Sequence, residues 1–128
     1  KTLKEEETDE KEPVKVRAFT KKMSNGNRLI TIRMKIHPGY RIYTQVDKSD
    51  PYLPTTITFV LPKGVEKVGE LKRPSGRAYN SAGTVVVEEE AIFTQEVRGT
   101  GNVTCVIEYQ SCNDQMCMPP AELSLIVK

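Results

Sequence analysis

Regular alternation between apolar and polar residues is the feature that most limits how this chain can fold. The clearest run places Ile30, Ile32, Met34 and Ile36 at every second position, with polar side chains between them. Successive side chains of a β-strand point to opposite faces of a sheet, so this run predicts a strand with one buried and one solvated face. No stretch repeats with the period of an amphipathic helix, so we expect an all-β domain.

Further alternating or apolar runs recur along the chain between turn-forming residues. They cover residues 14–18, 40–43, 56–61, 84–87, 91–93, 103–109 and 123–127. A series of roughly seven short strands predicts an antiparallel, immunoglobulin-like β-sandwich, with a small β-barrel as the alternative. The stretch 66–83 is polar and interrupted by glycine and proline, so we predict a long loop there.

The first residues and the overall charge set further limits. Residues 1–12 are almost all charged or polar, which predicts a disordered tail or linker, or alternatively an acidic docking segment, before a sandwich domain over residues 13–128. The net charge of +2 gives no reason to expect a nucleic-acid partner, and no apolar run is long enough to span a bilayer. Because the chain begins at Lys1 without a signal peptide, we expect a trimmed piece of a longer protein.

Three cysteines are too few for a scaffold built on disulfides. Cys105 lies on the apolar side of its strand, where a returning antiparallel strand would bring Leu125 opposite it. If that strand runs to Gln110, the Cα atoms of Cys105 and Cys112 are on the order of 20 Å apart, whereas a disulfide spans about 4.4–6.8 Å. We therefore predict a Cys112–Cys117 disulfide across one turn and a buried Cys105 thiol.

A cysteine pair in a polar, accessible loop has three possible uses. The first is thiol–disulfide exchange, which needs an accessible sulfur. The second is a structural disulfide in a non-catalytic interaction domain. The third is Cu(I) binding by Cys112, Cys117, Met116 and Met118, because soft sulfur ligands suit that ion. A structural zinc site is disfavoured because it needs four Cys or His ligands, and His37 is the one histidine.

Several short motifs stand out along the chain. They are Tyr109-Gln110-x-Cys112 with Cys117-x-Pro119-Pro120, Gly39-Tyr40-Arg41-Ile42-Tyr43, and Pro62-x-Gly64-Val65. With these motifs, residues 14–127 resemble the N-terminal periplasmic domain of the thiol:disulfide interchange protein DsbD. The resemblance implies an immunoglobulin-like sandwich in the bacterial periplasm, carried by an inner-membrane protein and using neither cofactor nor metal.

The resemblance also implies roles for individual residues. Cys112 and Cys117 would be the catalytic pair of a protein-disulfide reductase, with Cys117 forming the mixed disulfide with partners. Tyr40 and Tyr43 would lie beside the pair and donate hydroxyl hydrogen bonds. From the sequence itself, Asp114 would raise the pKa of a neighbouring thiol by like-charge repulsion.

A cap and a set of partners complete what the resemblance implies. Residues 66–76 would form a loop over the cysteine pair through Glu70 and Leu71, with Leu71 in place of the family's aromatic residue. Electrons would arrive from a thioredoxin-like C-terminal domain of the same protein. They would pass through transient mixed disulfides to thioredoxin-fold proteins, such as disulfide isomerases and cytochrome c maturation factors. We expect a monomer that meets the membrane only through domains outside this chain.

Overall fold

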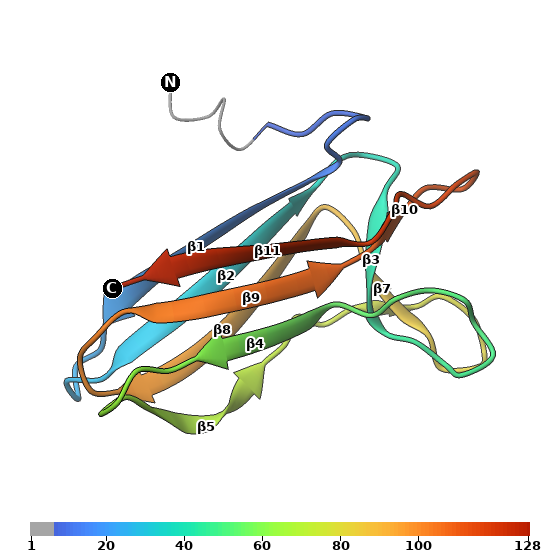
Figure 1. The fold of residues 1–128 in the computed structure, drawn as a ribbon. Coiled ribbons are helices and arrows are strands. Elements are labelled where there is room, and N and C mark those ends of the chain that lie inside the picture. The colour runs from blue at the N-terminus through green and yellow to red at the C-terminus, as the bar shows by residue number, and fades with distance from the viewer. Residues whose placement is uncertain (1–6) are drawn as a thin grey trace.

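The computed structural model describes residues 7–128, which form a β-sandwich with a small third sheet at one end (Figure 1). The strands are β1 (Val14–Lys22), β2 (Arg28–Ile36), β3 (Arg41–Gln45), β4 (Thr56–Val60), β5 (Glu66–Lys72), β6 (Arg77–Ala78), β7 (Val85–Val87), β8 (Glu90–Arg98), β9 (Val103–Tyr109), β10 (Ser111–Cys112) and β11 (Ala121–Val127). All neighbouring strands pair antiparallel, so the predicted all-β, antiparallel class is confirmed. Nowhere between residues 7 and 128 is there a helix with the length and hydrophobicity to cross a membrane.

Two sheets pack face to face to make the immunoglobulin-like sandwich. One has the strand order β1-β2-β8-β5 and the other the order β11-β9-β4. In Figure 1 the second sheet lies across the first, with the small third sheet at the right-hand end. Buried apolar residues from both sheets form one continuous core between them. The sequence alternatives are thereby resolved in favour of the sandwich.

The alternation seen in the sequence determines which side chains fill this core. In β2, Ile30, Ile32, Met34 and Ile36 are at most 4% exposed, as the period of two predicts. Each large apolar side chain buried in this way contributes about 1.5–3 kcal/mol relative to an exposed one. The sandwich therefore holds most of the apolar burial that stabilises the fold.

Cys105 lies in the middle of β9 with no exposed surface. Its register partners are Leu125 on β11 and Phe59 on β4, so the predicted position opposite Leu125 is confirmed. Burial raises the pKa of the Cys105 thiol to about 11, since the charged thiolate is disfavoured away from water. The thiol is therefore protonated at neutral pH and behaves as a small apolar side chain.

The third sheet is made from continuations of sandwich strands. Its order is β10-β3-β7-β6, and β3, β7 and β10 connect along the chain to β2, β8 and β9. Two of these connections contain a residue with a positive φ. Gly39, before β3, has a φ of +88°, and Glu89, between β7 and β8, has a φ of +70°. Residues 84–87 and 91–93, read from sequence as two strands or one bent strand, are therefore two strands in different sheets.

The stretch 66–83, predicted to be a long loop, contains two strands, so that prediction is wrong. β5 pairs with β8 at the edge of its sheet, and β6 pairs with β7. An edge strand can leave most side chains in water, and in β5 only Val68 and Leu71 are partly buried. The register shifts between Val68 and Lys72, around Gly69 with its φ of +75°. This bulge separates the two half-buried residues by three positions and hides the period of two.

The predicted N-terminal tail is described in part. Residues 1–6 lie outside the described residues. In the following segment, 7–13, the Thr8 hydroxyl lies 3.0 Å from Nδ1 of His37. This hydrogen bond ties the segment to the turn that precedes β3.

Candidate active site

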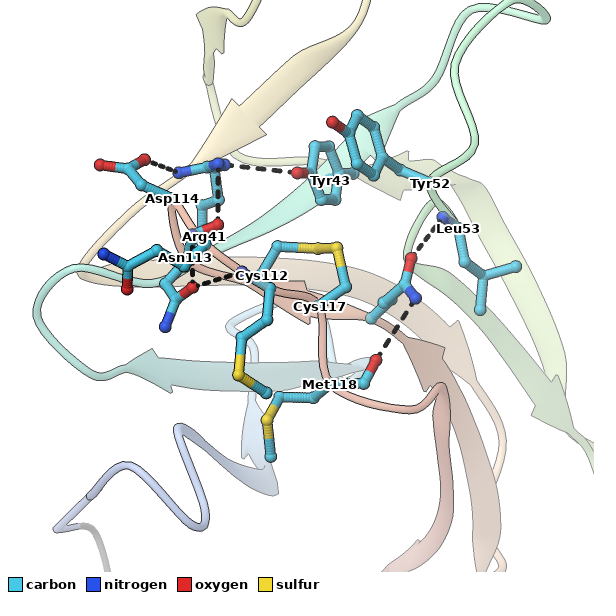
Figure 2. The surroundings of a disulfide bond; sticks show 12 residues. Arg41, Tyr43, Tyr52, Leu53, Cys112, Asn113, Asp114, Cys117 and Met118 are labelled. Carbon is cyan, nitrogen blue, oxygen red and sulfur yellow. Dashed lines mark hydrogen bonds and ion pairs between the residues drawn. A yellow bond between two sulfur atoms is a disulfide. The ribbon is translucent and has the colours of Figure 1, made fainter.

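The third sheet ends at β10, the two-residue strand that carries Cys112. β10 pairs with β3 so that Cys112 lies directly opposite Arg41. A disulfide joins Cys112 to Cys117, and the two Cα atoms are 3.9 Å apart (Figure 2). The structure thus shows the predicted bond, and Cys105 is a free, buried thiol.

The two halves of the disulfide differ in exposure. Cys112 is 1% exposed, because it lies against the side chains of the third sheet. Cys117 lies at the far side of the loop and is exposed to solvent. An incoming group therefore reaches the bond from the Cys117 side.

The loop between the cysteines holds itself in a tight turn. The N–H of Asn113 donates to the carbonyl of Met116 at 2.8 Å, and the Asn113 side-chain oxygen accepts from the N–H groups of Gln115 and Met116, both at 2.8 Å. At the base of the loop, the N–H of Met118 donates to the carbonyl of Ser111 at 2.8 Å. The polar sequence Asn113-Asp114-Gln115 forms this turn because an Asn side chain readily accepts hydrogen bonds from the backbone two residues on.

Arg41 is the charged group of the site, and its side chain is only 9% exposed. Its Nε donates to the Tyr43 hydroxyl at 3.3 Å, and its two terminal nitrogens donate to Asp114 Oδ1 at 3.1 Å and to the Asn113 carbonyl at 3.2 Å (Figure 2). The guanidinium also lies 5.1 Å from the ring centre of Tyr79. Burial lowers the pKa of Arg41, but the hydrogen bonds outweigh that effect and raise the pKa above its ordinary value. Arg41 thereby counters the negative charge that Asp114 brings near the thiols.

Three tyrosines pack together beside Cys112. Tyr43 has no exposed surface and stacks on Tyr52 with ring centres 4.4 Å apart and planes 7° apart. Tyr79 meets both rings edge-on, at 5.8 Å and 5.6 Å. The Tyr52 and Tyr79 hydroxyls lie 3.3 Å apart, and this contact raises the pKa of Tyr52 to about 12. Burial raises the pKa of Tyr43 as well.

Two loops bring the outer tyrosines to the site. The β3–β4 loop, residues 46–55, carries Tyr52, and the β6–β7 loop, residues 79–84, carries Tyr79. Asp50 of the first loop accepts hydrogen bonds from Asn80 Nδ2, at 2.9 Å, and from the Thr84 hydroxyl of the second. In Figure 1 the two loops run side by side at the end of the molecule that carries β10.

Gln110 connects the β3–β4 loop to the end of the disulfide loop. Its side-chain oxygen accepts from the N–H of Leu53 at 3.0 Å, and its side-chain nitrogen donates to the carbonyl of Met118 at 3.3 Å (Figure 2). One side chain therefore fixes two loops relative to each other. This explains physically why a glutamine follows Tyr109 in the motif read from the sequence.

A cavity of about 160 Å³ lies beside the disulfide. It is lined by Arg41, Tyr43, Tyr52, Tyr79 and residues 112–117. Its walls combine aromatic rings with the one guanidinium, and it adjoins the exposed Cys117. A cavity of this size suits a small side chain, such as a cysteine presented by another protein.

The structure brings some of the predicted site residues together and leaves others apart. Tyr43 lies at the disulfide with Cys112, as expected. Tyr40 instead packs in the sandwich core and lines a different cavity, because it precedes β3 and falls on the other side of the chain. Glu70 and Leu71 lie in β5, where Leu71 packs against the sandwich core. Neither lines the cavity beside the disulfide, so this structure does not place the predicted cap over the pair.

Arg41, Tyr52 and Tyr79 are site residues that sequence reasoning missed. A signal existed for Arg41, since residues two apart on a strand share a face, and Arg41 is two before Tyr43. No local signal existed for Tyr52 and Tyr79. Their positions depend on how two separate loops pack.

No group of three or more His, Cys, Asp or Glu side chains in residues 7–128 is placed to hold a metal ion. For the Cu(I) alternative, the sulfur atoms of Cys112 and Cys117 are bonded to each other in this state, and Met118 packs against the sandwich core.

Comparison with known proteins assigns the family. The family described as "Thiol:disulfide interchange protein DsbD, N-terminal" matches residues 10–127 of this chain. Among curated proteins, none matches.

Solved structures share the fold. The reduced DsbD N-terminal domain of Neisseria meningitidis is 17% identical with a TM-score of 0.54, covering 77% of this chain and 75% of that one. The complex of the DsbD and PilB N-terminal domains from the same organism gives 13% identity and a TM-score of 0.61, covering 92% of this chain and 84% of that one.

A third structure, the N-terminal periplasmic domain of ScsB from Proteus mirabilis, is 21% identical with a TM-score of 0.57. That alignment covers 88% of this chain but only 44% of the ScsB chain, so here the similarity spans less than half of the larger protein. Sequence match, fold and the cysteine pair agree, and the chain belongs to the family of DsbD N-terminal domains of thiol:disulfide interchange proteins.

Proposed function

We propose that this domain relays electrons between proteins by thiol–disulfide exchange at Cys112 and Cys117, acting as a protein-disulfide reductase. The observation that carries the proposal is the unequal exposure of the two bonded cysteines, with Cys117 at the surface and Cys112 only 1% exposed. Exchange needs one sulfur that a partner can reach and a second that can resolve the mixed disulfide. A purely structural disulfide would have no need of an open side facing a cavity.

The exchange reaction runs in two displacements. In the reduced domain, the Cys117 thiolate attacks a sulfur of the partner's disulfide. That disulfide breaks, and its second sulfur leaves as a thiolate and takes up a proton. The Cys112 thiolate then attacks Cys117 Sγ, the mixed disulfide breaks, and the partner leaves as a dithiol while the Cys112–Cys117 bond forms. Two electrons and two protons have then moved from the domain to the partner.

Recharging is the same sequence in reverse. A thiolate of a reducing protein attacks Cys117 Sγ, and Cys112 leaves. The exposed position of Cys117 supports attack at this sulfur in both directions. The same sulfur, Cys117 Sγ, would therefore link the domain to the protein that it reduces and to the protein that reduces it.

The proposed setting follows from the family. We place the domain in the bacterial periplasm, as a monomeric domain of a larger inner-membrane protein, with thioredoxin-fold proteins as its partners. A complex of a related DsbD N-terminal domain with a PilB N-terminal domain supports partners that are themselves protein domains. The electron donor would be a thioredoxin-like domain of the same protein.

Trapping the mixed disulfide tests the proposal. The probe is a thioredoxin with a single active-site cysteine, activated as a mixed disulfide with thionitrobenzoate. Cys112→Ser should release thionitrobenzoate and accumulate a covalent adduct, because nothing can resolve it. Cys117→Ser should form the adduct at least about tenfold more slowly, because its remaining thiol is buried. The wild-type domain should release thionitrobenzoate and then free the thioredoxin.

All three proteins should carry Cys105→Ala, so that only the site thiols can react. Adduct formed faster by Cys117→Ser than by Cys112→Ser would assign the partner-linking role to Cys112. Absence of adduct from both variants would contradict exchange and leave the structural disulfide. Both outcomes are read from a non-reducing gel and the absorbance of the released thionitrobenzoate.

A further inference from the structure

Arg41 makes more contacts than the exchange reaction requires. The two displacements use only sulfur atoms and protons, yet a nearly buried guanidinium uses three nitrogens at this site. Burying such a group is costly unless its donors are satisfied, so its presence calls for a function of its own. Three features of its contacts identify that function.

The first feature is where the contacts lead. Arg41 belongs to β3, and its two terminal nitrogens reach the carbonyl of Asn113 and the carboxylate of Asp114 (Figure 2). These two residues directly follow Cys112 and form the first half of the turn that carries Cys117. A planar guanidinium fixes direction as well as distance, so this contact orients the turn relative to β3.

The second feature is the kind of group that Arg41 binds: its side-chain hydrogen bonds go to oxygen atoms, and its cation–π contact goes to a ring. Its partners are a carbonyl, a carboxylate, a hydroxyl and an aromatic ring, and reduction of the disulfide does not alter these groups chemically. The disulfide and the Arg41 contacts therefore hold the same turn through different atoms. When one is lost, the other is left to hold it.

The third feature separates position from charge. The positive charge of Arg41 is paired with Asp114, whose side chain is 90% exposed. The pair has little net charge to offer a thiolate, and solvent screens what remains. Geometry is therefore the larger of the two effects that Arg41 can have on the cysteines.

We propose that Arg41 is a positioning residue that keeps Cys117 opposite Cys112 after the disulfide has been reduced. This inference rests on the proposed exchange function. The two thiols then meet at a high effective concentration, and the resolving attack of Cys112 on Cys117 needs no search. By thermodynamic reciprocity, a contact that the disulfide favours must favour the disulfide by the same factor. Arg41 thus makes the reduced domain a stronger electron donor.

Equilibration with glutathione measures this effect directly. In the balanced reaction, the protein disulfide and two molecules of reduced glutathione give the protein dithiol and one molecule of oxidised glutathione. Arg41→Lys keeps the charge but loses the planar fork, and should shift this equilibrium toward the dithiol by about tenfold. For a two-electron couple, that factor corresponds to a reduction potential higher by about 30 mV.

Three further variants complete the test, and one of them is Arg41→Gln, which removes the charge. Asp114→Asn changes a side chain that is 90% exposed, and should shift the equilibrium in the same direction by about threefold. The matched control is Arg98→Lys, which alters an exposed ion pair with Glu66 on the sandwich, at 3.3 Å, and should leave the equilibrium unchanged. If Arg41 only stabilised the fold, its substitution would lower thermal stability equally in both redox states and would leave the reduction potential unchanged.

The outcomes separate this inference from the function on which it rests. A wild-type disulfide that does not equilibrate with glutathione would contradict the proposed exchange function. A wild-type disulfide that equilibrates normally, with Arg41→Lys and Asp114→Asn both matching it, would overturn the positioning role alone. If Arg41→Lys matches the wild type while Arg41→Gln shifts the equilibrium, Arg41 acts through its charge, and the positioning role is again overturned.

Discussion

Cys105 and Cys112 are equally buried, at 0% and 1% exposed, yet they lie in very different regions of the molecule. Cys105 is in the middle of a sandwich strand, with apolar side chains on both neighbouring strands. Cys112 is at the end of a two-residue strand, opposite an arginine and bonded to a cysteine that solvent can reach. Burial alone therefore does not decide the reactivity of a cysteine. What decides it is whether a neighbouring group gives access to the sulfur.

The same contrast holds for the two regions as a whole. The sandwich core is almost entirely aliphatic and aromatic, and its strands other than the edge strand β5 follow the period of two. The third sheet instead packs the Tyr43 hydroxyl, a nearly buried guanidinium and the buried half of a disulfide beside three tyrosines. Stability and chemistry are therefore supplied by different ends of one molecule.

Alkylation rates should show the largest difference between the two buried cysteines. After mild reduction with dithiothreitol, iodoacetamide should modify Cys117 first and Cys112 next. Cys105 should react on the order of 100-fold more slowly than Cys117 or slower still, because it needs an opening of the sandwich core. Peptide mapping by mass spectrometry over time measures all three rates. Comparable rates for Cys105 and Cys117 would show that the core opens as readily as the loop.

A core truncation should separate stability from redox behaviour. Phe93, on β8, is fully buried in the sandwich. Phe93→Ala should lower the free energy of unfolding by about 3–5 kcal/mol, through lost burial and the cavity that remains. Tyr52→Ala, at the other end, should lower it by about 1–2 kcal/mol. Urea denaturation measures both.

The glutathione equilibrium serves as the second measurement on these two variants. It should stay within about twofold of wild type for Phe93→Ala under conditions where that variant is folded. A shift of the Phe93→Ala equilibrium by more than twofold would mean that the two ends of the molecule are coupled.

The raised pKa of Cys105 predicts a dependence of stability on pH. The thiol has a pKa of about 11 in the folded state against an ordinary value of 9.0. As the pH rises, the unfolded chain loses this proton before the folded protein does. The contribution of the protonated Cys105 thiol to the free energy of unfolding is therefore fully present below pH 9 and is lost as the pH rises through 11. By pH 11 the loss should be about 2 kcal/mol.

Comparison with Cys105→Ala isolates this effect, because tyrosines titrate in the same range. The stability difference between the wild type and Cys105→Ala should be constant below pH 9 and should move in favour of the variant above it. Thermal unfolding followed by circular dichroism at a series of pH values gives the difference. A gap that stays constant up to pH 11 would show that the thiol is not confined to an apolar site.

Sequence reasoning succeeded where a local pattern determines the structure. The apolar positions of β2 follow from a period of two, and the placement of Cys105 opposite Leu125 follows from an antiparallel return of the last strand. Both are confirmed. The Cys112–Cys117 disulfide followed from strand length alone. The edge strand β5 was missed because its backbone pairs with β8 while most of its side chains stay in water.

The composition of the site was harder to predict, for two physical reasons. The choice between Tyr40 and Arg41 depends on where β3 begins, and the turn at Gly39 sets that phase. The approach of Tyr52 and Tyr79 depends on hydrogen bonds between loops far apart in sequence. Neither depends on a repeating pattern that a single sequence displays.

One exposed sulfur in the pair has a consequence for steady-state kinetics. In the exchange that we propose, donor and acceptor proteins both react at Cys117, so they should not be bound productively at the same time. Turnover must then alternate between two half-reactions in a ping-pong scheme, with parallel lines in double-reciprocal plots. When the donor domain is supplied as a separate protein in such an assay, donor and acceptor should each inhibit the other competitively, so the ratio of their two concentrations should affect the rate.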